Sequence, residues 1–219
     1  MGTSPEAGRG MTARLLPLSG AAFVIGAVAA IVVLGGDTPD GNSSAAKVSS
    51  FYQAHQNRQN LAAFVLAASL PLLVFFGVSL ALSLWPAAGR RPVWQAVLVG
   101  GSVLAAGAFA LSAFVHFTLA DSADSVSAST AQGLNALDAD NWIAFNSCLG
   151  VMMFGAAGSL IPRTGTYRIL GWIALLLAIA LLIPFADFFG LLLTAIWIIV
   201  VSVMLFRREP PPLGGSGLA

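Results

Sequence analysis

Long apolar runs constrain the fold of this chain more than any other feature of its sequence. A bilayer core of about 30 Å needs about 20 apolar residues in each crossing helix, and runs of that length recur here between sparse charges. Hydrophobic residues make up 58% of the chain and charged residues 9%, and the mean hydropathy is +0.87. Ordinary soluble domains do not reach these values. The sequence therefore predicts an all-α polytopic membrane protein.

The runs predict a bundle of six transmembrane helices, at about residues 15–34, 61–85, 93–119, 142–161, 168–184 and 187–206. The last two lie in one apolar stretch, which Pro184, Asp187 and Gly190 divide because such residues interrupt a helix and its hydrophobicity. The tails, residues 1–14 and 207–219, are rich in Pro and Gly and are expected to be disordered. Met11 is an alternative start, and a cleavable signal peptide is the alternative to the first span.

The basic residues predict the orientation, because Lys and Arg in short loops stay on the cytoplasmic side. Most of them flank the predicted helices on one side: Arg9, Arg14, Arg90, Arg91, Arg163, Arg168, Arg207 and Arg208. The loops on the opposite side carry most of the aspartates. We therefore expect a multi-pass plasma-membrane protein with both termini in the cytoplasm. With a net charge of +1 and no concentrated basic surface, the chain is not expected to bind nucleic acid.

Two outer loops are long enough to hold structure of their own. Ser43 or Ser44 is suited to cap a helix that continues through residues 51–60 into the second span. Residues 127–138, SASTAQGLNALD, predict a short helix that lies over the outer surface. The outer end of the protein is therefore expected to be helical rather than loose.

Small residues recur three or four positions apart on the predicted spans, where they allow close helix packing in lipid. They are Gly26 and Ala30, then Gly101, Ala105 and Ser112, then Gly155 and Ser159. We expect these stripes to pack helices within the chain, with a homo-oligomer interface as the alternative. Pro71 lies inside the second span and is expected to kink it.

Polar and aromatic residues near the outer ends of the spans are the candidates for function, because ionisable groups at membrane depth are costly. We expect them to bound an outward-facing pocket that binds a ligand. Its residues are Phe51, Tyr52, His55, Arg58, His116, Asn146 and Asp187. The alternative for the aromatic members is the interfacial belt found in any membrane protein.

Arg58 breaks the charge rule by lying on the acidic side. A guanidinium in a partly dry place favours a carboxylate partner. The available partners are Asp37, Asp121, Asp140 and Asp187. We expect a structural ion pair with one of them, and the alternative is an anchor for an anionic ligand or lipid headgroup.

Metal binding is a further alternative. His55 and His116 could share an ion with Asp121 or Asp187, and Asp121 with Asp124 is similar to the acidic motifs that hold magnesium and diphosphate in prenyl-transfer enzymes. Neither spacing fixes a geometry, so we assign no metal and no cofactor. The single cysteine, Cys148, excludes an internal disulfide.

Several stretches, among them FYQAHQNRQNLAAFVL, ALDADNWIAFN and RTGTYRILGWIALLLAI, resemble a family of uncharacterised six-helix integral membrane proteins from actinobacteria. The resemblance covers roughly residues 15–208 and implies the same fold. It implies no activity for any residue. The excess of Arg over Lys fits a bacterial source rich in GC.

The leading functional hypothesis is a membrane protein that binds or moves a small hydrophobic or amphipathic molecule in the outer pocket. One alternative is a membrane enzyme acting on a lipid or isoprenoid, with Asp187 or His116 as its acid or base. Another is an accessory subunit of a membrane complex. A coupled transporter is disfavoured, since the spans carry no charge at the midplane.

Overall fold

A computed structural model of the chain describes residues 15–85 and 92–207. The expectations for the tails, including the basic residues before Leu15 and after Arg207, and for Arg90 and Arg91 lie outside these residues. Within the described ranges every regular element is a helix, so the fold is all-α. Five helical segments are long and apolar enough to cross a membrane, which agrees with a multi-pass membrane protein.

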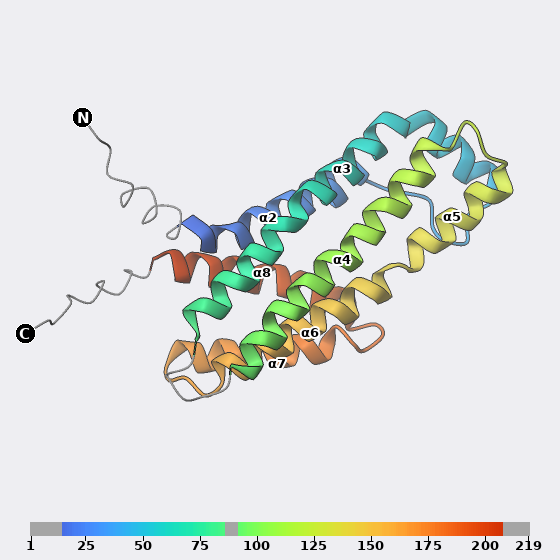
Figure 1. Ribbon diagram of the computed structural model, residues 1–219. Helices are drawn as coiled ribbons and strands as arrows, with labels where there is room; N and C mark the ends of the chain where they lie inside the picture. Colours follow the sequence, from blue (N-terminus) through green and yellow to red (C-terminus); the bar gives the residue numbers. More distant parts are fainter. Residues whose placement is uncertain (1–14, 86–91, 208–219) are drawn as a thin grey trace, which may run out of the picture.

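The first described elements are a short 3-10 turn and an α-helix that continues as a π-helix. In order, the elements are η1 (Leu16–Leu18), α2 (Ser19–Val28), η2 (Ala29–Gly35), α3 (Ala45–Ser83), α4 (Val93–Asp121), α5 (Ala128–Asp140), α6 (Trp142–Leu160), α7 (Thr166–Ala180) and α8 (Asp187–Phe206). Helices α3 and α4 run side by side and extend past α2, α7 and α8 at the end where α5 lies (Figure 1).

Helix α3 is longer than a membrane span requires. Its 39 residues would measure about 58 Å at a rise of about 1.5 Å per residue, about twice the thickness of a bilayer core. Ser44 caps the helix by accepting a hydrogen bond from the backbone N–H of Lys47, which confirms the expected start. The first four turns of α3 therefore belong to the end of the molecule outside the predicted span.

The regular geometry of α3 is interrupted at His55, where φ is −122° and ψ is 15°. Nδ1 of His55 lies 2.8 Å from the carbonyl oxygen of Phe51, and the two rings stack with centroids 4.6 Å apart. The ring thus contacts the same carbonyl that the His55 backbone N–H would bind in a regular helix, and local side chains are known to compete with the backbone in this way. Pro71 lies inside α3 without dividing the helix.

Small residues bring helices into backbone contact within the chain. A Cβ on Gly101 of α4 would meet the backbone of Met152, and one on Gly155 of α6 would meet the backbone of Leu98. Likewise, a Cβ on Gly26 would lie 2.8 Å from Cβ of Ser69. The stripes predicted from sequence therefore pack α4 on α6 and α2 on α3.

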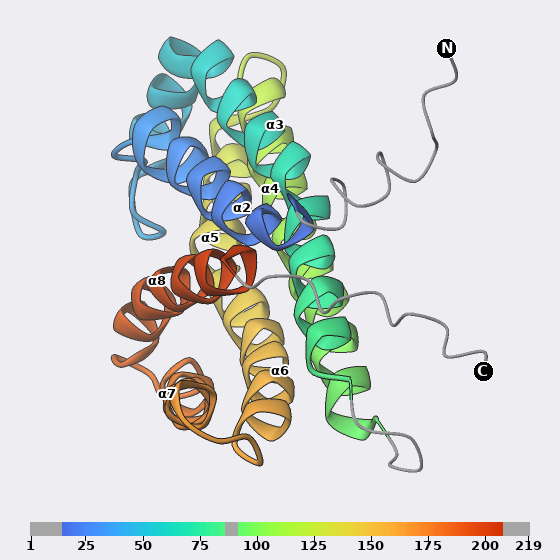
Figure 2. The same cartoon turned by 90° about the vertical axis from the view of Figure 1, so that its left-hand side faces the viewer.

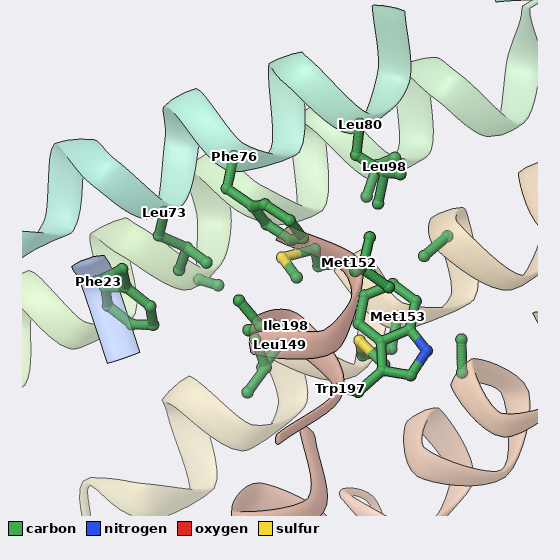
Figure 3. Close-up of a cluster of buried hydrophobic side chains, with 14 of the residues drawn as sticks. Phe23, Leu73, Phe76, Leu80, Leu98, Leu149, Met152, Met153, Trp197 and Ile198 are labelled. Atoms are coloured by element: carbon green, nitrogen blue, oxygen red, sulfur yellow. The ribbon is translucent and has the colours of Figure 1, made fainter. Parts of the chain in front are cut away.

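The main core lies where α2, α3, α4, α6 and α8 meet (Figure 3). It contains Phe23, Leu73, Phe76, Leu80, Leu98, Leu149, Met152, Met153, Trp197 and Ile198. The indole Nε1 of Trp197 donates to the carbonyl of Leu170, 3.1 Å away, and so fixes α8 on α7. A second, smaller core joins the start of α3 to the end of α4 and to α5.

The start of the first helix and the end of the last lie at the same end of the bundle. A Cβ on Gly20 of α2 would meet the hydroxyl of Ser202 in α8, and Figure 2 shows these helix ends side by side. The turns after α3 and α6 also meet, because Arg163 donates to the carbonyl of Leu84 over 2.6 Å and Gln95 donates to the same oxygen over 3.0 Å. An arginine there stabilises the C-terminal carbonyls of α3.

The two last helices differ in length. The turn expected near Pro184 is present: α7 ends at Ala180 and α8 begins at Asp187. Helix α7 has 15 residues, so it measures about 22 Å, which is less than a bilayer core of about 30 Å. Five segments therefore satisfy the length of a membrane span, and α7 is a shorter apolar helix.

Candidate outer binding site

A polar network fills the space between the first turns of α3, the end of α4 and the surface helix α5. Helix α5 is capped at Ser127, whose hydroxyl accepts from the backbone N–H of Thr130, which confirms the helix expected there. It is held on the loop before α3 by two amides. Gln132 donates to the carbonyl of Ser43 over 2.9 Å, and Asn135 donates to that of Asp40 over 3.0 Å.

His116 is the centre of this network. Its Nδ1 lies 2.7 Å from Oδ2 of Asp138 on α5, and its Nε2 lies 2.9 Å from Oε1 of Gln59 on α3. Gln59 is fully buried, and its Nε2 donates to the carbonyl of Gly35 over 2.8 Å. One continuous chain of hydrogen bonds therefore runs from α5 through α4 and α3 to the end of η2.

The direction of these bonds follows from Gly35. A carbonyl only accepts, so the amide nitrogen of Gln59 must face Gly35 and its oxygen must face His116. Nε2 of His116 therefore carries a hydrogen and donates it to Gln59. The short Nδ1–Oδ2 contact with Asp138 then needs one further proton between the two atoms. His116 and Asp138 thus hold a shared proton whenever both contacts are made.

Arg58 joins the network at the same carbonyl. One guanidinium nitrogen lies 3.3 Å from the oxygen of Gly35 and donates to it. The expected ion pair with Asp37, Asp121, Asp140 or Asp187 is wrong, because the one ion pair among the described residues joins His116 to Asp138. Gly36 makes this arrangement possible: its φ of 63° is favourable only for glycine, and a Cβ there would lie 3.2 Å from the guanidinium.

Tyr52 packs beneath His116, with ring centroids 5.9 Å apart in an edge-to-face contact. Its side chain is fully buried in the smaller core, and its hydroxyl has no hydrogen-bond partner among the described residues. Burial, and to a smaller degree the carboxylate of Asp138, raises the pKa of the Tyr52 phenol above its ordinary range. The phenol therefore stays neutral beside the shared proton.

A cavity of about 130 Å³ opens below the network, between η2, α3 and α4. Its walls are mostly alanine and branched apolar side chains, including Ala30, Ile31, Ala63 and Leu66. Its polar lining comes from the ring of His116, the backbone of Gly35 and Gly36, and the residues Thr38 and Ser112. The cavity thus has both apolar and polar lining, and His116 connects its polar lining to the network.

The seven residues predicted for one pocket are divided in the structure. His116 lines the cavity beside η2, and Arg58 and Tyr52 contact its surroundings. Phe51 and His55 stack on each other, about two turns and one turn before Arg58 in α3, and Phe51 also contacts Tyr52. Asn146 and Asp187 line a second cavity, of about 190 Å³, between α6 and the α7–α8 turn, where Nδ2 of Asn146 lies 3.3 Å from Oδ2 of Asp187.

The chemistry open to His116 follows from its contacts. Both ring nitrogens are occupied, by Asp138 and Gln59. To move a proton to a substrate or to bind a metal, the ring would have to leave one of these partners. Over residues 15–85 and 92–207, no three His, Cys, Asp or Glu side chains gather as they would around a metal ion.

Gln59 and Asp138 are the residues that sequence reasoning missed. Gln59 lies in the polar run FYQAHQNRQN, but at seven residues after Tyr52 and seven before Leu66 it shares their buried face of α3. That spacing was the available signal. For Asp138 the sequence offers none, since several similar aspartates lie in the same region.

Comparisons of the chain with protein families, with curated proteins and with solved structures find no match. The resemblance to uncharacterised actinobacterial membrane proteins stays a prediction from the sequence.

Proposed function

We propose that the protein crosses a bacterial plasma membrane six times, with α7 as the sixth span and both termini in the cytoplasm. The meeting of Gly20 with Ser202 supports this, because termini on one side require an even number of crossings. The position of Arg163 at that end also supports a cytoplasmic assignment.

Cysteine labelling in cells tests the topology. Cys148 is the single native cysteine, so its replacement removes all background labelling. In a Cys148→Ser background, a cysteine replacing exposed Ser129 on α5 is expected to react with a membrane-impermeant maleimide in intact cells. A cysteine replacing exposed Thr164, between α6 and α7, is expected to react only after permeabilisation. Labelling of both in intact cells would contradict a crossing by α6, and labelling of the Thr164→Cys site alone would contradict the cytoplasmic assignment of that end.

We propose further that the protein binds a small amphipathic molecule in the cavity beside η2. The observation that carries this proposal is the cavity itself, which is lined by apolar side chains and by two members of the polar network, His116 and Gly35. A cavity of about 150 Å³ holds a benzene-sized molecule. The space of about 130 Å³ therefore suits one ring or a short chain with one polar group.

The polar group would meet hydroxyls rather than the histidine nitrogens. His116 is saturated by Asp138 and Gln59, whereas the hydroxyls of Ser112 and Thr38 form no hydrogen bond among the described residues. Both hydroxyls belong to residues that line the cavity. A neutral hydroxyl or carbonyl group on the ligand matches them better than a charge does.

The test uses 4-fluorobenzyl alcohol as a probe, with ¹⁹F NMR of the purified protein in detergent. Saturable binding to the wild type is expected, and Ala63→Leu is expected to abolish it by filling the cavity. Ala67→Leu is the matched control, because it places the same side chain on the exposed face of the same helix. Equal binding by the wild type and Ala63→Leu would contradict the proposal.

A further inference from the structure

The network around His116 needs one proton more than a neutral histidine and an ionised aspartate supply. It consists of three contacts in a row: Gln59 to the carbonyl of Gly35, His116 to Gln59, and His116 to Asp138. The two ends of this row, a backbone carbonyl and a carboxylate, only accept hydrogen bonds. Every hydrogen in the row must therefore come from the amide of Gln59 and from the ring of His116.

Without that proton, no rotation of the side chains satisfies all three contacts. If the one N–H of a neutral ring faces Gln59, then Nδ1 and the carboxylate of Asp138 are two acceptors 2.7 Å apart. If the N–H faces Asp138 instead, Nε2 meets the oxygen of Gln59. Turning the amide of Gln59 only moves the conflict, because its oxygen then lies against the carbonyl of Gly35. Loss of the proton therefore breaks one contact of the row.

The contact between His116 and Asp138 is the one that we expect to break. Gln59 is fully buried, so an unmatched acceptor at its end of the row has no water to bind, which is costly. The side chain of Asp138 is 16% exposed, and its carboxylate reaches water when it leaves the ring. The conflict is thus resolved at the lowest cost on the side of α5.

This contact holds α5 on α4. In the described part of the chain it is the one hydrogen bond between the two helices, since Gln132 and Asn135 of α5 donate to the loop before α3. What remains between α4 and α5 is apolar packing in the smaller core, to which α4 contributes Ala120 and α5 contributes Ala131. Loss of the proton therefore leaves α5 attached to the loop but weakly attached to α4.

We propose that α5 is a proton-dependent strap, which is bound to α4 while His116 and Asp138 hold their shared proton and is released from α4 when that proton is lost. The bound form holds one proton more than the released form, so release is favoured as the pH rises and not as it falls. The strap depends neither on a ligand in the cavity beside η2 nor on the orientation of the chain in the membrane.

The other ionisable groups around the ring do not take part in this change. The phenol of Tyr52, in edge contact with the ring, stays neutral because it is buried, and Arg58 at the carbonyl of Gly35 stays charged. The π-helix η2 contains no ionisable residue. None of the other carboxylates on α5 or on the ends and loops next to it forms an ion pair with a described residue: Asp37, Asp40, Asp121, Asp124 and Asp140.

Hydrogen exchange of the full-length protein in detergent tests the strap. Protection factors, which are corrected for the chemical exchange rate, are measured between about pH 5 and about pH 8, where histidine changes charge. Those of the α5 amides are expected to fall as the pH rises, by up to about tenfold per pH unit, the slope set by a single proton. Those of α6 are expected to stay constant. Constant protection of α5, or an equal fall in α6, would overturn the proposal.

Asp138→Asn separates a proton-dependent contact from a merely structural one. A carboxamide can accept from the charged ring and can donate to the neutral ring, so the row is complete in both states. We expect α5 of Asp138→Asn to keep its protection at the high end of the pH range, where the wild type loses it. Asp140→Asn, an exposed change on the same helix, is the matched control and should keep the wild-type slope. The wild-type slope in Asp138→Asn would overturn the proposal.

His116→Phe keeps the strap testable if Asp138→Asn does not fold. It removes the ring that titrates, so the protection of α5 is expected to be low at every pH and to lose its slope. A wild-type slope in His116→Phe would show that another group controls α5, and the proposal would fail.

Discussion

His116 and Asp138 lie 2.7 Å apart, Nδ1 to Oδ2, and this contact ties the end of α4 to the surface helix α5. Each side chain is about one-sixth exposed, 17% for His116 and 16% for Asp138. The pair is therefore screened less than a surface ion pair, whose contribution is usually below about 1 kcal/mol. It is the strongest candidate for the contact that holds the outer end together.

We expect the pair to be energetically coupled. Asp138→Ala is expected to lower the free energy of unfolding by about 1–2 kcal/mol, since it leaves Nδ1 of His116 without its partner. In a double-mutant cycle with His116→Phe, most of that loss is expected to disappear. The measurement is denaturation of the purified protein in mixed micelles.

Asp140→Ala provides the control for this cycle. Asp140 lies on the same helix but is exposed, and exposed substitutions usually change stability by less than about 0.5 kcal/mol. Equal effects of Asp138→Ala and Asp140→Ala, or additivity of Asp138→Ala with His116→Phe, would show that the short contact contributes nothing.

Gln59 is expected to matter more than its neighbour Gln56. Both donate to a backbone carbonyl, Gln59 to that of Gly35 and Gln56 to that of Asp121 over 3.0 Å. Gln59 is buried, whereas Gln56 is only partly buried and its hydrogen bond is exposed. Gln59→Leu leaves the N–H of His116 without an acceptor in a buried place, which costs about 1–3 kcal/mol.

Gln56→Leu leaves its former acceptor open to water and is expected to cost well under 1 kcal/mol. The two variants are compared by their unfolding midpoints in one detergent. Equal midpoints would mean that water, and not the protein, satisfies the partners of Gln59.

These residues also mark the limit of what the sequence could predict. The helical outer loops followed from local signals, a cap at Ser43 or Ser44 and the run SASTAQGLNALD. The division of α7 from α8 followed from Pro184 and its neighbours. Each of these predictions depended only on residues close together in the sequence. The partner of Arg58 did not follow, because it depends on a backbone carbonyl left free where the π-helix η2 ends at Gly35.

The same reason explains why one predicted pocket became two cavities. The sequence places Asn146, Asp187 and His116 at similar height in the membrane, but height does not fix position around the bundle. Helix α6 turns Asn146 towards the α7–α8 turn, and α4 turns His116 towards α3 and α5. Only the packing of the helices decides which polar ends meet.

Tyr52 is expected to resist ionisation. Tyr167→Phe leaves Tyr52 as the single tyrosine, so absorbance at 295 nm then reports its phenol alone. Because the pKa of Tyr52 is raised in the folded state and an unfolded tyrosine titrates near pH 10, the unfolded chain loses its proton first. The free energy of unfolding should therefore fall as the pH rises above about 10.

Tyr52→Phe removes the titrating group and is expected to remove this part of the pH dependence. It should otherwise cost little, because the hydroxyl it deletes has no partner. A phenol that titrates near pH 10 while the helical circular dichroism is intact would show that water reaches Tyr52 in the folded protein.

Gly100 and Gly101 provide a matched pair of sites for testing how α4 packs on α6. They are neighbours in one helix, but a Cβ on Gly101 would meet the backbone of Met152, whereas around Gly100 nothing lies within 4 Å. Gly101→Ala must push α6 away, and because backbone cannot rotate aside as a side chain can, we expect a loss of about 1–3 kcal/mol or more. Gly100→Ala faces open space, so the higher helix propensity of alanine should leave stability unchanged or raise it by up to about 1 kcal/mol.

Unfolding midpoints of Gly100→Ala and Gly101→Ala, measured side by side, separate packing from propensity because the two changes are chemically identical. Gly155→Ala should behave like Gly101→Ala, since its Cβ would meet the backbone of Leu98 from the opposite helix. If α4 and α6 instead associated only loosely, all three variants would be as stable as the wild type. A loss of stability confined to Gly101→Ala and Gly155→Ala would show that the backbones of α4 and α6 are in direct contact. That contact fixes the positions of His116 on α4 and Asn146 on α6.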